Sequence, residues 1–350
     1  MRVLERLDEL YAIGGGPGAN RLGGSAEEDE AHALAAAWMR EAGLQVDVDP
    51  AGNLFGRLAG RSGDLPEVWT GSHLDSVPAG GRLDGALGVV AGLEAVERIG
   101  QQERTLAVVA FRDEEGCRGP GCVGSRALCE GWLDPKPAAF VEAHVEQGPR
   151  LEQAGAPLAV VTGIVATARG ELVFEGEPGH AGTTPMADRH DALAAAAEFV
   201  LALRDTAGAV DGAVATVGRL EVEPGATNVI PSRVVVSVDV RAPDSERLEA
   251  VLAVVPGETR RAEAVTMAPA PTDALRVELS RLGLQVVELP SGAGHDAGVL
   301  AAAGVPTAML FVRSLNGGVS HSPEEETSAE DIAWCVEALD GALTTLASVE

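Results

Sequence analysis

The sequence predicts an α/β protein in which a mixed sheet flanked by helices is interrupted by an inserted ferredoxin-like domain. Helix and strand patterns alternate over residues 1–163, as they do in α/β sheets. Residues 164–267 follow the order βαββαβ, which is complete in itself. The alternation then resumes over residues 268–350. A chain of 350 residues also exceeds what one hydrophobic core usually holds, which favours two domains.

In the first segment, two helices precede the strands. The N-terminal stretch MRVLERLDELYAIGG is amphipathic. Ser25 is expected to cap the next helix, with Glu28 at the capping-box position and Gly43 at its end. A third helix is expected at about 85–99. Apolar runs predict strands at 44–49, 53–59, 67–74, 105–111 and 138–146.

The other two segments are interpreted in the same way. The insert is expected to contain strands at 171–177, 213–222, 232–242 and 260–268, and helices at 187–207 and 244–255. The last segment is expected to contain helices at 272–283, 296–304 and from about 328, and strands at 284–290 and 306–312. Residues 1–163 and 268–350 are therefore expected to form one domain, and 164–267 a second.

The composition argues against several kinds of partner. The chain carries 53 acidic and 26 basic residues, a net charge of −27, and this field repels a phosphate backbone. No stretch of 18 apolar residues is present. We therefore expect no nucleic-acid and no membrane partner. The N-terminal stretch lacks a signal-peptide pattern and the four cysteines form no C-x-x-C pair, so we expect a reducing, cytoplasmic location.

Histidines and carboxylates gather where the predicted strands end. His73 and Asp75 close the strand at 67–74, and side chains two apart on a strand share one face. Other strand ends, or the loops after them, carry Asp84, Asp113, Glu114, Glu115, His144, Glu146, Gln147 and His321. Ligands of α/β sheets bind outside the strand ends, so these side chains are candidates for one site.

Imidazole and carboxylate together suit zinc, manganese, cobalt or nickel. Taken singly, each of these residues is more often an ordinary surface or core residue, and DEEG alone is more often a solvated turn. Their convergence on one rim favours a site, because crowded acids repel each other unless a cation is present. Three histidines and several acids exceed the needs of one tetrahedral site. Two ions that share a carboxylate are therefore expected.

A second set of candidates lies in the insert and in the last segment. His180 is in a Gly/Thr/Pro loop before a helix. Asn228 and Arg241 are suited to bind a carboxylate, with the arginine as a bidentate clamp, although Arg241 alone is more often a surface charge. PSGAGHDAG places Gly294 and His295 at a strand-to-helix turn. Its backbone N–H groups are suited to hold an anion, and a plain tight turn is the alternative.

Seven motifs, in order along about residues 20–335, resemble those of the hydantoinase/carbamoylase family. They are TGSHLDSVPAGGRLDGALGV, FRDEEG, AHVEQGPRLE, PGHAGTTPM, TNVIPSRVVVSVDVR, SGAGHDAG and SHSPEE. This family includes N-carbamoyl-L-amino-acid hydrolases, allantoate amidohydrolases and two-metal β-ureidopropionases, and belongs to the aminoacylase/carboxypeptidase-like metallohydrolases. The resemblance implies a metallopeptidase-like catalytic domain and an inserted lid and dimerisation domain.

The resemblance also implies roles for residues at matching positions. Two divalent ions (zinc, manganese, cobalt or nickel) would be held by His73, Asp84, Glu115, His144 and His321. Asp84 would bridge the ions, and its peptide bond to Gly85 is cis in relatives. Glu114 would be the general base, and Asp75 would orient His73 from behind.

The substrate contacts follow from the same resemblance. Arg241 and Asn228 would hold a carboxylate, helped by the backbone around Gly294, and Gln147 and His295 would line the pocket. His180 would act at the carbonyl in the site of a second subunit, so a homodimer formed through the insert is expected.

The resemblance implies hydrolysis of a linear ureido C–N bond in a small substrate that carries a carboxylate. An N-carbamoyl-L-amino acid would give the amino acid, carbon dioxide and ammonia. Allantoate amidohydrolase activity is the closest alternative. An aminoacylase or dipeptidase is a weaker one, since those relatives usually carry a carboxylate where His144 stands. A non-catalytic ligand-binding relative is the alternative of another class, and Glu114 counts against it because ligand binding alone needs no base.

Overall fold

A computed structural model describes residues 2–117 and 119–348 of the chain. The chain forms two compact units, one made of Met1–Gly163 and Thr266–Glu350 and the other of Ile164–Val265. Each unit has a sheet of its own, which in the described part of the chain has nine strands in the first unit and five in the second. Among the described residues, no helix is long and apolar enough to cross a membrane.

The sheet of the first unit is mixed, as predicted. Its strand order is β1-β2-β4-β3-β5-β14-β6-β12, with β13 paired to β6. The strands are β1 (Gln45–Val48), β2 (Leu54–Leu58), β3 (Val68–His73), β4 (Leu106–Phe111), β5 (Ala139–Val145), β6 (Leu158–Ile164), β12 (Val265–Thr266), β13 (Val287–Ser291) and β14 (Thr307–Val312). Neighbours β4, β3, β5 and β14 are parallel, and β2 and β6 join them antiparallel. Every residue of the four parallel strands is buried, which explains their continuous apolar runs.

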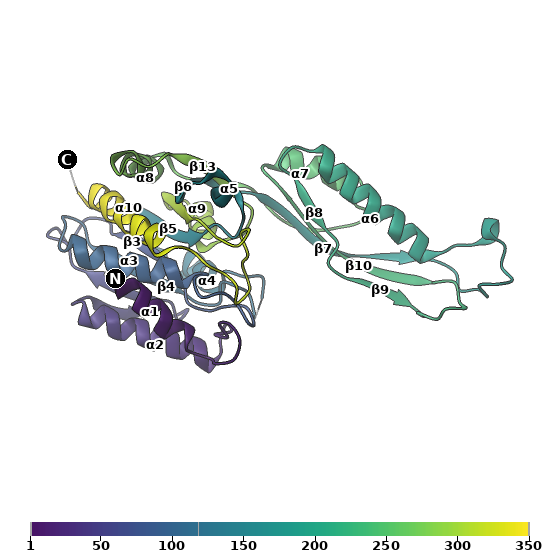
Figure 1. Ribbon diagram of the computed structural model, residues 1–350, viewed down its shortest axis with the longest axis horizontal. Helices are drawn as coiled ribbons and strands as arrows, with labels where there is room; N and C mark the ends of the chain where they lie inside the picture. Colours follow the sequence, from purple (N-terminus) through teal and green to yellow (C-terminus); the bar gives the residue numbers. More distant parts are fainter. Residues whose placement is uncertain (1, 118, 349–350) are drawn as a thin grey trace. The chain divides into compact units, whose positions relative to one another are not determined.

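Helices cover both faces of this sheet (Figure 1). One hydrophobic core joins α1 (Arg2–Tyr11), α2 (Ala26–Glu41), α3 (Ala86–Ile99), α8 (Pro269–Arg281) and α10 (Ala329–Ala347) to alternate residues of β4 and β5. The intervening residues of β5 therefore point to the opposite face. There α9 (Asp296–Ala302) lies close, since Ala297 N donates to Glu142 Oε2 at 2.8 Å. The short helices α4 (Val123–Gly131) and α5 (Arg150–Ala154) were not expected from the sequence.

In the second unit, both helices pack on one face of an antiparallel sheet (Figure 1). The strands are β7 (Ala166–Glu175), β8 (Val214–Thr216), β9 (Leu220–Glu223), β10 (Arg233–Ala242) and β11 (Arg260–Ala262). Their order is β11-β7-β10-β8, with β9 also paired to β10. The helices are α6 (Ala192–Ala209) and α7 (Ser245–Leu252), and a 3-10 turn, η1 (Met186–Asp188), precedes them. Two expected strands are broken: 213–222 into β8 and β9, and 260–268 into β11 and β12, which belong to different sheets.

Helix α2 begins as predicted, but its capping box is only half formed. Ser25 Oγ accepts the N–H of Glu28 at 3.2 Å. The N–H of Ser25 donates to Leu22 O at 2.9 Å, so the expectation that it donates to the Glu28 carboxylate was wrong. The Glu28 carboxylate accepts the N–H groups of Gly24 at 2.6 Å and Asp113 at 3.0 Å. In a capping box the Glu28 carboxylate would accept the N–H of Ser25. Here it accepts the N–H of Asp113, which follows β4.

Candidate active site

The four parallel strands carry the candidate site at their carboxyl ends. His73 is the last residue of β3, and His144 is the last but one of β5. Glu114 and Glu115 follow β4, and His321 follows β14. Because parallel strands end at the same edge of a sheet, residues far apart in the sequence meet there.

Asp84 lies at the centre of this edge. Its Oδ1 is 3.6 Å from His73 Nε2 and 3.2 Å from His144 Nε2. Its Oδ2 is 3.3 Å from His321 Nε2, which is itself 3.6 Å from Glu115 Oε2. The donor atoms thus form two groups, one of His73, Asp84 and His144 and one of Asp84, Glu115 and His321, each within 4.8 Å. Asp84 belongs to both groups.

The donor spacing fits divalent ions. Two ligand atoms about 2.1 Å from a tetrahedral ion are about 3.4 Å apart. The four separations given above, from 3.2 to 3.6 Å, bracket that value. In addition, His73 Nε2, His144 Nε2 and Glu115 Oε1 are buried and have no hydrogen-bond partner among the residues that the structure describes, which is unfavourable. Cations beside Asp84 would satisfy all three atoms.

A glycine turn brings Asp84 onto the His73 ring. Gly85 has φ 64°, and a Cβ there would lie 2.4 Å from His73 Cε1, so only glycine fits. The expected cis peptide bond before Gly85 is not found. Among the described residues, cis bonds precede Pro135 and Pro224. The positive φ of Gly85 makes the turn instead.

Asp75 holds the glutamates and the first histidine together. It is fully buried, and its Oδ1 accepts the N–H of Glu114 at 3.0 Å and lies 3.2 Å from His73 Nδ1. Its Oδ2 accepts the N–H of Glu115 at 3.1 Å. The side chain of Glu114 then reaches 3.8 Å from His73 Nε2, and the Cys122 thiol donates to its Oε1 at 3.5 Å. Glu114 therefore lies beside the two donor groups without belonging to either.

The pKa values in the site follow from burial and from the crowding of carboxylates. Burial opposes ionisation of Asp84, but the rings of His144, His321 and His73 beside it outweigh burial and hold its pKa well below the usual range. Burial and the nearby Asp84 raise the pKa of Glu115 to about 7. Burial also raises the pKa of Glu114 well above its ordinary value. Added positive charge would favour the ionised form of both glutamates.

Comparison with known proteins identifies the family. Residues 69–345 match the model of peptidase family M20/M25/M40. The chain belongs to this family. It is 39% identical to the N-carbamoyl-L-amino acid amidohydrolase of Geobacillus stearothermophilus, over 100% of this chain and 99% of the relative. It is 34% identical to the allantoate amidohydrolase of Bacillus subtilis (strain 168), over 96% of this chain and 95% of the relative.

A solved structure agrees. The crystal structure of an amidase of the hydantoinase/carbamoylase family from Burkholderia multivorans superposes with a TM-score of 0.92 at 32% identity, covering 99% of this chain and 98% of that one. The resemblance predicted from the seven motifs is thus confirmed, as is a mixed α/β fold with a mixed sheet.

Three of the residues expected to line the substrate pocket of this M20 chain lie in the first unit. Gln147 Nε2 donates to Asp84 Oδ2 at 2.9 Å, so its amide faces the donor groups directly. His295 is only 3% exposed, and its ring centroid is 4.4 Å from that of His144. Gly294 is exposed in the loop before α9. Gln147 therefore borders the site, whereas His295 packs behind one of its histidines.

The other candidates lie on the second unit, and two of them are neighbours. Ala181 N donates to Asn228 O at 3.0 Å, and His180 forms an isolated bridge with Val229. Both His180 and Asn228 are exposed. They therefore lie close together at one end of this unit.

Arg241 lies near the other end of β10. Its guanidinium pairs with Asp239 through Nε at 2.9 Å and Nη2 at 3.0 Å. From Arg233 to Arg241 the strand rises roughly 26 Å, at about 3.3 Å per residue. Asn228 lies further out, because the pairing continues beyond Arg233 with Ile230 N donating to Gly179 O. A single chain therefore does not bring Asn228 and Arg241 to one carboxylate.

Glu325 supports the site and was not assigned from the sequence. Its Oε1 accepts the N–H groups of Leu83 at 2.8 Å and Asp84 at 3.0 Å, and its Oε2 accepts the Ser320 hydroxyl at 3.0 Å. It thereby ties the turn that carries Asp84 to the loop that carries His321. In the sequence, Glu325 belongs to the run SPEEE, which is typical of a solvated surface. The only signal that could have indicated its role is that this run follows His321.

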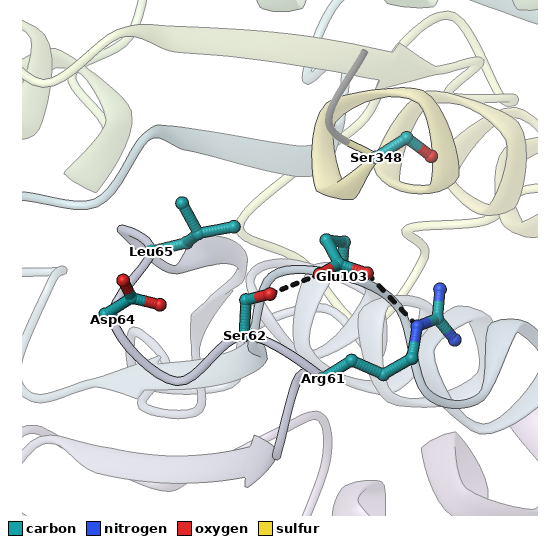
Figure 2. A pocket seen from close by; sticks show the side chains of 6 residues that line it. All are labelled: Arg61, Ser62, Asp64, Leu65, Glu103 and Ser348. Carbon is teal, nitrogen blue, oxygen red and sulfur yellow. Dashed lines mark hydrogen bonds and ion pairs between the residues drawn. The ribbon is translucent and has the colours of Figure 1, made fainter.

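Two features lie outside the site. Glu146 accepts the N–H groups of Arg150 and Leu151, both at 2.8 Å, and so caps α5. A surface hollow of about 490 Å³ is lined by Arg61, Ser62, Asp64, Leu65, Glu103 and Ser348 (Figure 2). Most of these residues precede β3 or β4, so the hollow lies at the amino ends of the strands, opposite the candidate site.

Proposed function

We propose that this chain hydrolyses the C–N bond of a linear ureido group and that its substrates are N-carbamoyl-L-amino acids. The observation that carries the proposal is the pair of donor groups sharing Asp84, with the carboxylate of Glu114 beside them. The amidohydrolase names of the relatives support the reaction class. The products would be the amino acid and carbamate, which decays to carbon dioxide and ammonia.

His73 and His144 would hold one divalent ion with Asp84, and Glu115 and His321 the other. The mix of imidazole and carboxylate suits zinc, manganese, cobalt or nickel. Two such ions, when bound, polarise a carbonyl and make water acidic enough to act as a nucleophile near neutral pH.

Glu114 would act as the general base. Its carboxylate would take a proton from the attacking water and deliver it to the nitrogen of the leaving amine. Asp75 would orient the Glu114 side chain, because its carboxylate accepts the peptide N–H groups of Glu114 and Glu115. The Cys122 thiol contributes one further hydrogen bond to the Glu114 carboxylate.

The second unit would serve as a ferredoxin-like lid and as the contact surface of a homodimer. Its sheet order and its two helices on one face support the ferredoxin-like assignment. Arg241 and Asn228 would bind the substrate carboxylate from different chains, because β10 separates them within one chain. His180, as the neighbour of Asn228, would come from the same chain as Asn228 and act at the ureido carbonyl.

A substrate panel tests the proposal. The protein would be loaded in turn with zinc, manganese, cobalt and nickel, and ammonia release would be measured with N-carbamoyl-L-amino acids, their D-isomers, allantoate and ureidoglycolate. We expect the highest kcat/KM with N-carbamoyl-L-amino acids. Preference for allantoate would support the alternative that the Bacillus subtilis relative suggests. N-acetyl amino acids and dipeptides would be tested with the same protein by release of the free amino acid. Bound metal with no turnover of any of these substrates would reject an enzyme.

A cytoplasmic location remains part of the proposal. All four cysteines are free thiols, which agrees with a reducing compartment.

A further inference from the structure

A buried glutamate of α2 contacts the loop that carries Glu114 and Glu115. Glu28 is 1% exposed. Its Oε1 accepts the N–H of Asp113 at 3.0 Å, and its Oε2 accepts the N–H of Gly24 at 2.6 Å. Arg112 Nη1 lies 3.2 Å from the same Oε2. Both oxygens are therefore engaged, and one of them reaches a residue 85 positions away.

The loop depends on carboxylates from other segments. Asp113 has φ 47°, a left-handed conformation that non-glycine residues keep only where their surroundings hold it. The N–H groups of Asp113, Glu114 and Glu115 donate in turn to Glu28 and to the two oxygens of Asp75. Successive N–H groups of this kind form an anion-binding concavity. Glu28 and Asp75 fill it with side-chain carboxylates.

The segment before α2 also packs tightly on the loop. A Cβ at Gly23 would lie 2.0 Å from Asp113 Oδ1, so this position admits only glycine beside the present loop. Asp113 Oδ1 in turn accepts the N–H of Cys117 at 2.9 Å. Shape and charge thus act together: Gly23 permits the close approach, and Glu28 supplies the hydrogen bond.

We propose that Glu28 is a positioning residue for the reaction. Its carboxylate fixes the peptide of Asp113 and so sets the directions in which Glu114 and Glu115 leave the backbone. This inference rests on the proposed function, in which Glu114 is the base and Glu115 a metal ligand. Glu28 itself is separated from the reacting atoms by the loop and touches none of the five proposed metal ligands in any described contact.

The chain offers a matched control on the next residue. Asp29 is exposed, and its Oδ1 pairs with the same Arg112 Nη1 at 2.8 Å. Asp29→Ala removes one carboxylate from Arg112 and leaves the bond to Asp113 in place. Glu28→Ala removes both the charge and that bond. Glu28→Gln keeps an oxygen for Asp113 N–H but turns an amide donor toward the N–H of Gly24.

The first measurement is steady-state kinetics of the metal-loaded protein with its best substrate from the panel. A misplacement of about 1 Å lowers catalysis by about 100-fold. We expect kcat to fall by about that factor in Glu28→Ala, with KM within about threefold, by a smaller factor in Glu28→Gln, and by less than about twofold in Asp29→Ala. A role in stability alone would lower the melting temperature but leave kcat per folded, metal-loaded chain unchanged.

The second measurement is amide hydrogen exchange of residues 113–117 in the metal-free protein, which needs no activity. Exchange should be at least about tenfold faster in Glu28→Ala than in the wild type, and unchanged in Asp29→Ala. Wild-type kcat and wild-type exchange in Glu28→Ala would overturn the inference. If Glu28→Ala does not fold, the same two comparisons are made with Glu28→Gln. A wild-type protein without turnover would instead reject the proposed function, while the exchange data still decide whether Glu28 holds the loop.

Discussion

Replacing Asp75 by asparagine tests how the site is held together. Asp75 Oδ1 accepts the N–H of Glu114 at 3.0 Å and lies 3.2 Å from His73 Nδ1, so the new amide oxygen would best occupy that position. The new NH2 group then faces the N–H of Glu115, which Oδ2 accepts at 3.1 Å in the wild type. Because two N–H donors then face each other, the charge-assisted hydrogen bond between Asp75 and the N–H of Glu115, which contributes about 1.5–3 kcal/mol, is lost.

This loss should appear in metal affinity. His73 and Glu115 belong to different donor groups, so Asp75→Asn disturbs both. Loss of an outer hydrogen-bonding partner of metal ligands typically lowers affinity about 10–100-fold, or about 1.4–2.7 kcal/mol, which agrees with the value from the hydrogen bond. Competition titrations with a chelator and zinc or manganese would measure the change.

Asp331 supplies the control. It is buried and pairs with Arg313 through two contacts of 2.9 Å, and it belongs to neither donor group. Asp331→Asn should lower the free energy of unfolding but leave metal affinity at the wild-type value. If Asp75→Asn binds both ions as tightly as the wild type does, Asp75 does not orient the ligands.

Four other perturbations test the general base, the metal ions, the sharing of sites between chains and a buried histidine. Glu114→Gln should bind two ions normally while kcat falls by about 100- to 10,000-fold, as rapid kinetics and metal analysis would show, and near-normal turnover would remove Glu114 from the role of base. Chelation should abolish turnover and lower the melting temperature measured by scanning fluorimetry, because buried carboxylates lose their cations; an active chelated protein would contradict this. Mixing inactive Glu114→Gln chains with inactive His180→Ala chains should restore about a quarter of the wild-type activity, since half of the dimers are mixed and one of their two sites is intact; a mixture as inactive as its parts would argue against sites shared between chains. Burial lowers the pKa of His32 from 6.5 to about 4, so the unfolded chain takes up a proton on this residue before the folded chain does as the pH falls. The free energy of unfolding should therefore drop by up to about 3 kcal/mol between pH 6.5 and pH 4. In urea titrations, His32→Asn should lose that part of the pH dependence.

The parts of the fold that could be predicted are those whose residues are buried on both sides. Strands β3, β4, β5 and β14 stand out as unbroken apolar runs because parallel strands are covered on both faces. The mostly exposed residues of β8 and β9 carry a weaker pattern, and the break between them was missed. The boundary inside 260–268 was missed because which sheet β11 and β12 join depends on their partners, which lie far away in the sequence.

The candidate site also contains contacts that could be predicted from the sequence and contacts that could not. The donors of both groups lie in short motifs at strand ends, so they could be found from the sequence alone. Contacts that depend on tertiary pairing could not. The pattern Ser-x-x-Glu at Ser25 is equally consistent with a local cap and with a bond to Asp113, and only the folded chain shows which donor Glu28 takes. Likewise, Asn228 and Arg241 are close in sequence, but an extended strand separates them in space.

In the proposed site, Asp84 joins two cation sites. Anomalous diffraction from crystals grown with manganese tests it directly, because it locates each ion independently of the protein density. We expect two peaks, both within bonding distance of Asp84, one flanked by His73 and His144 and the other by Glu115 and His321. A single peak in an active protein, or two peaks that leave Asp84 unbound, would contradict it.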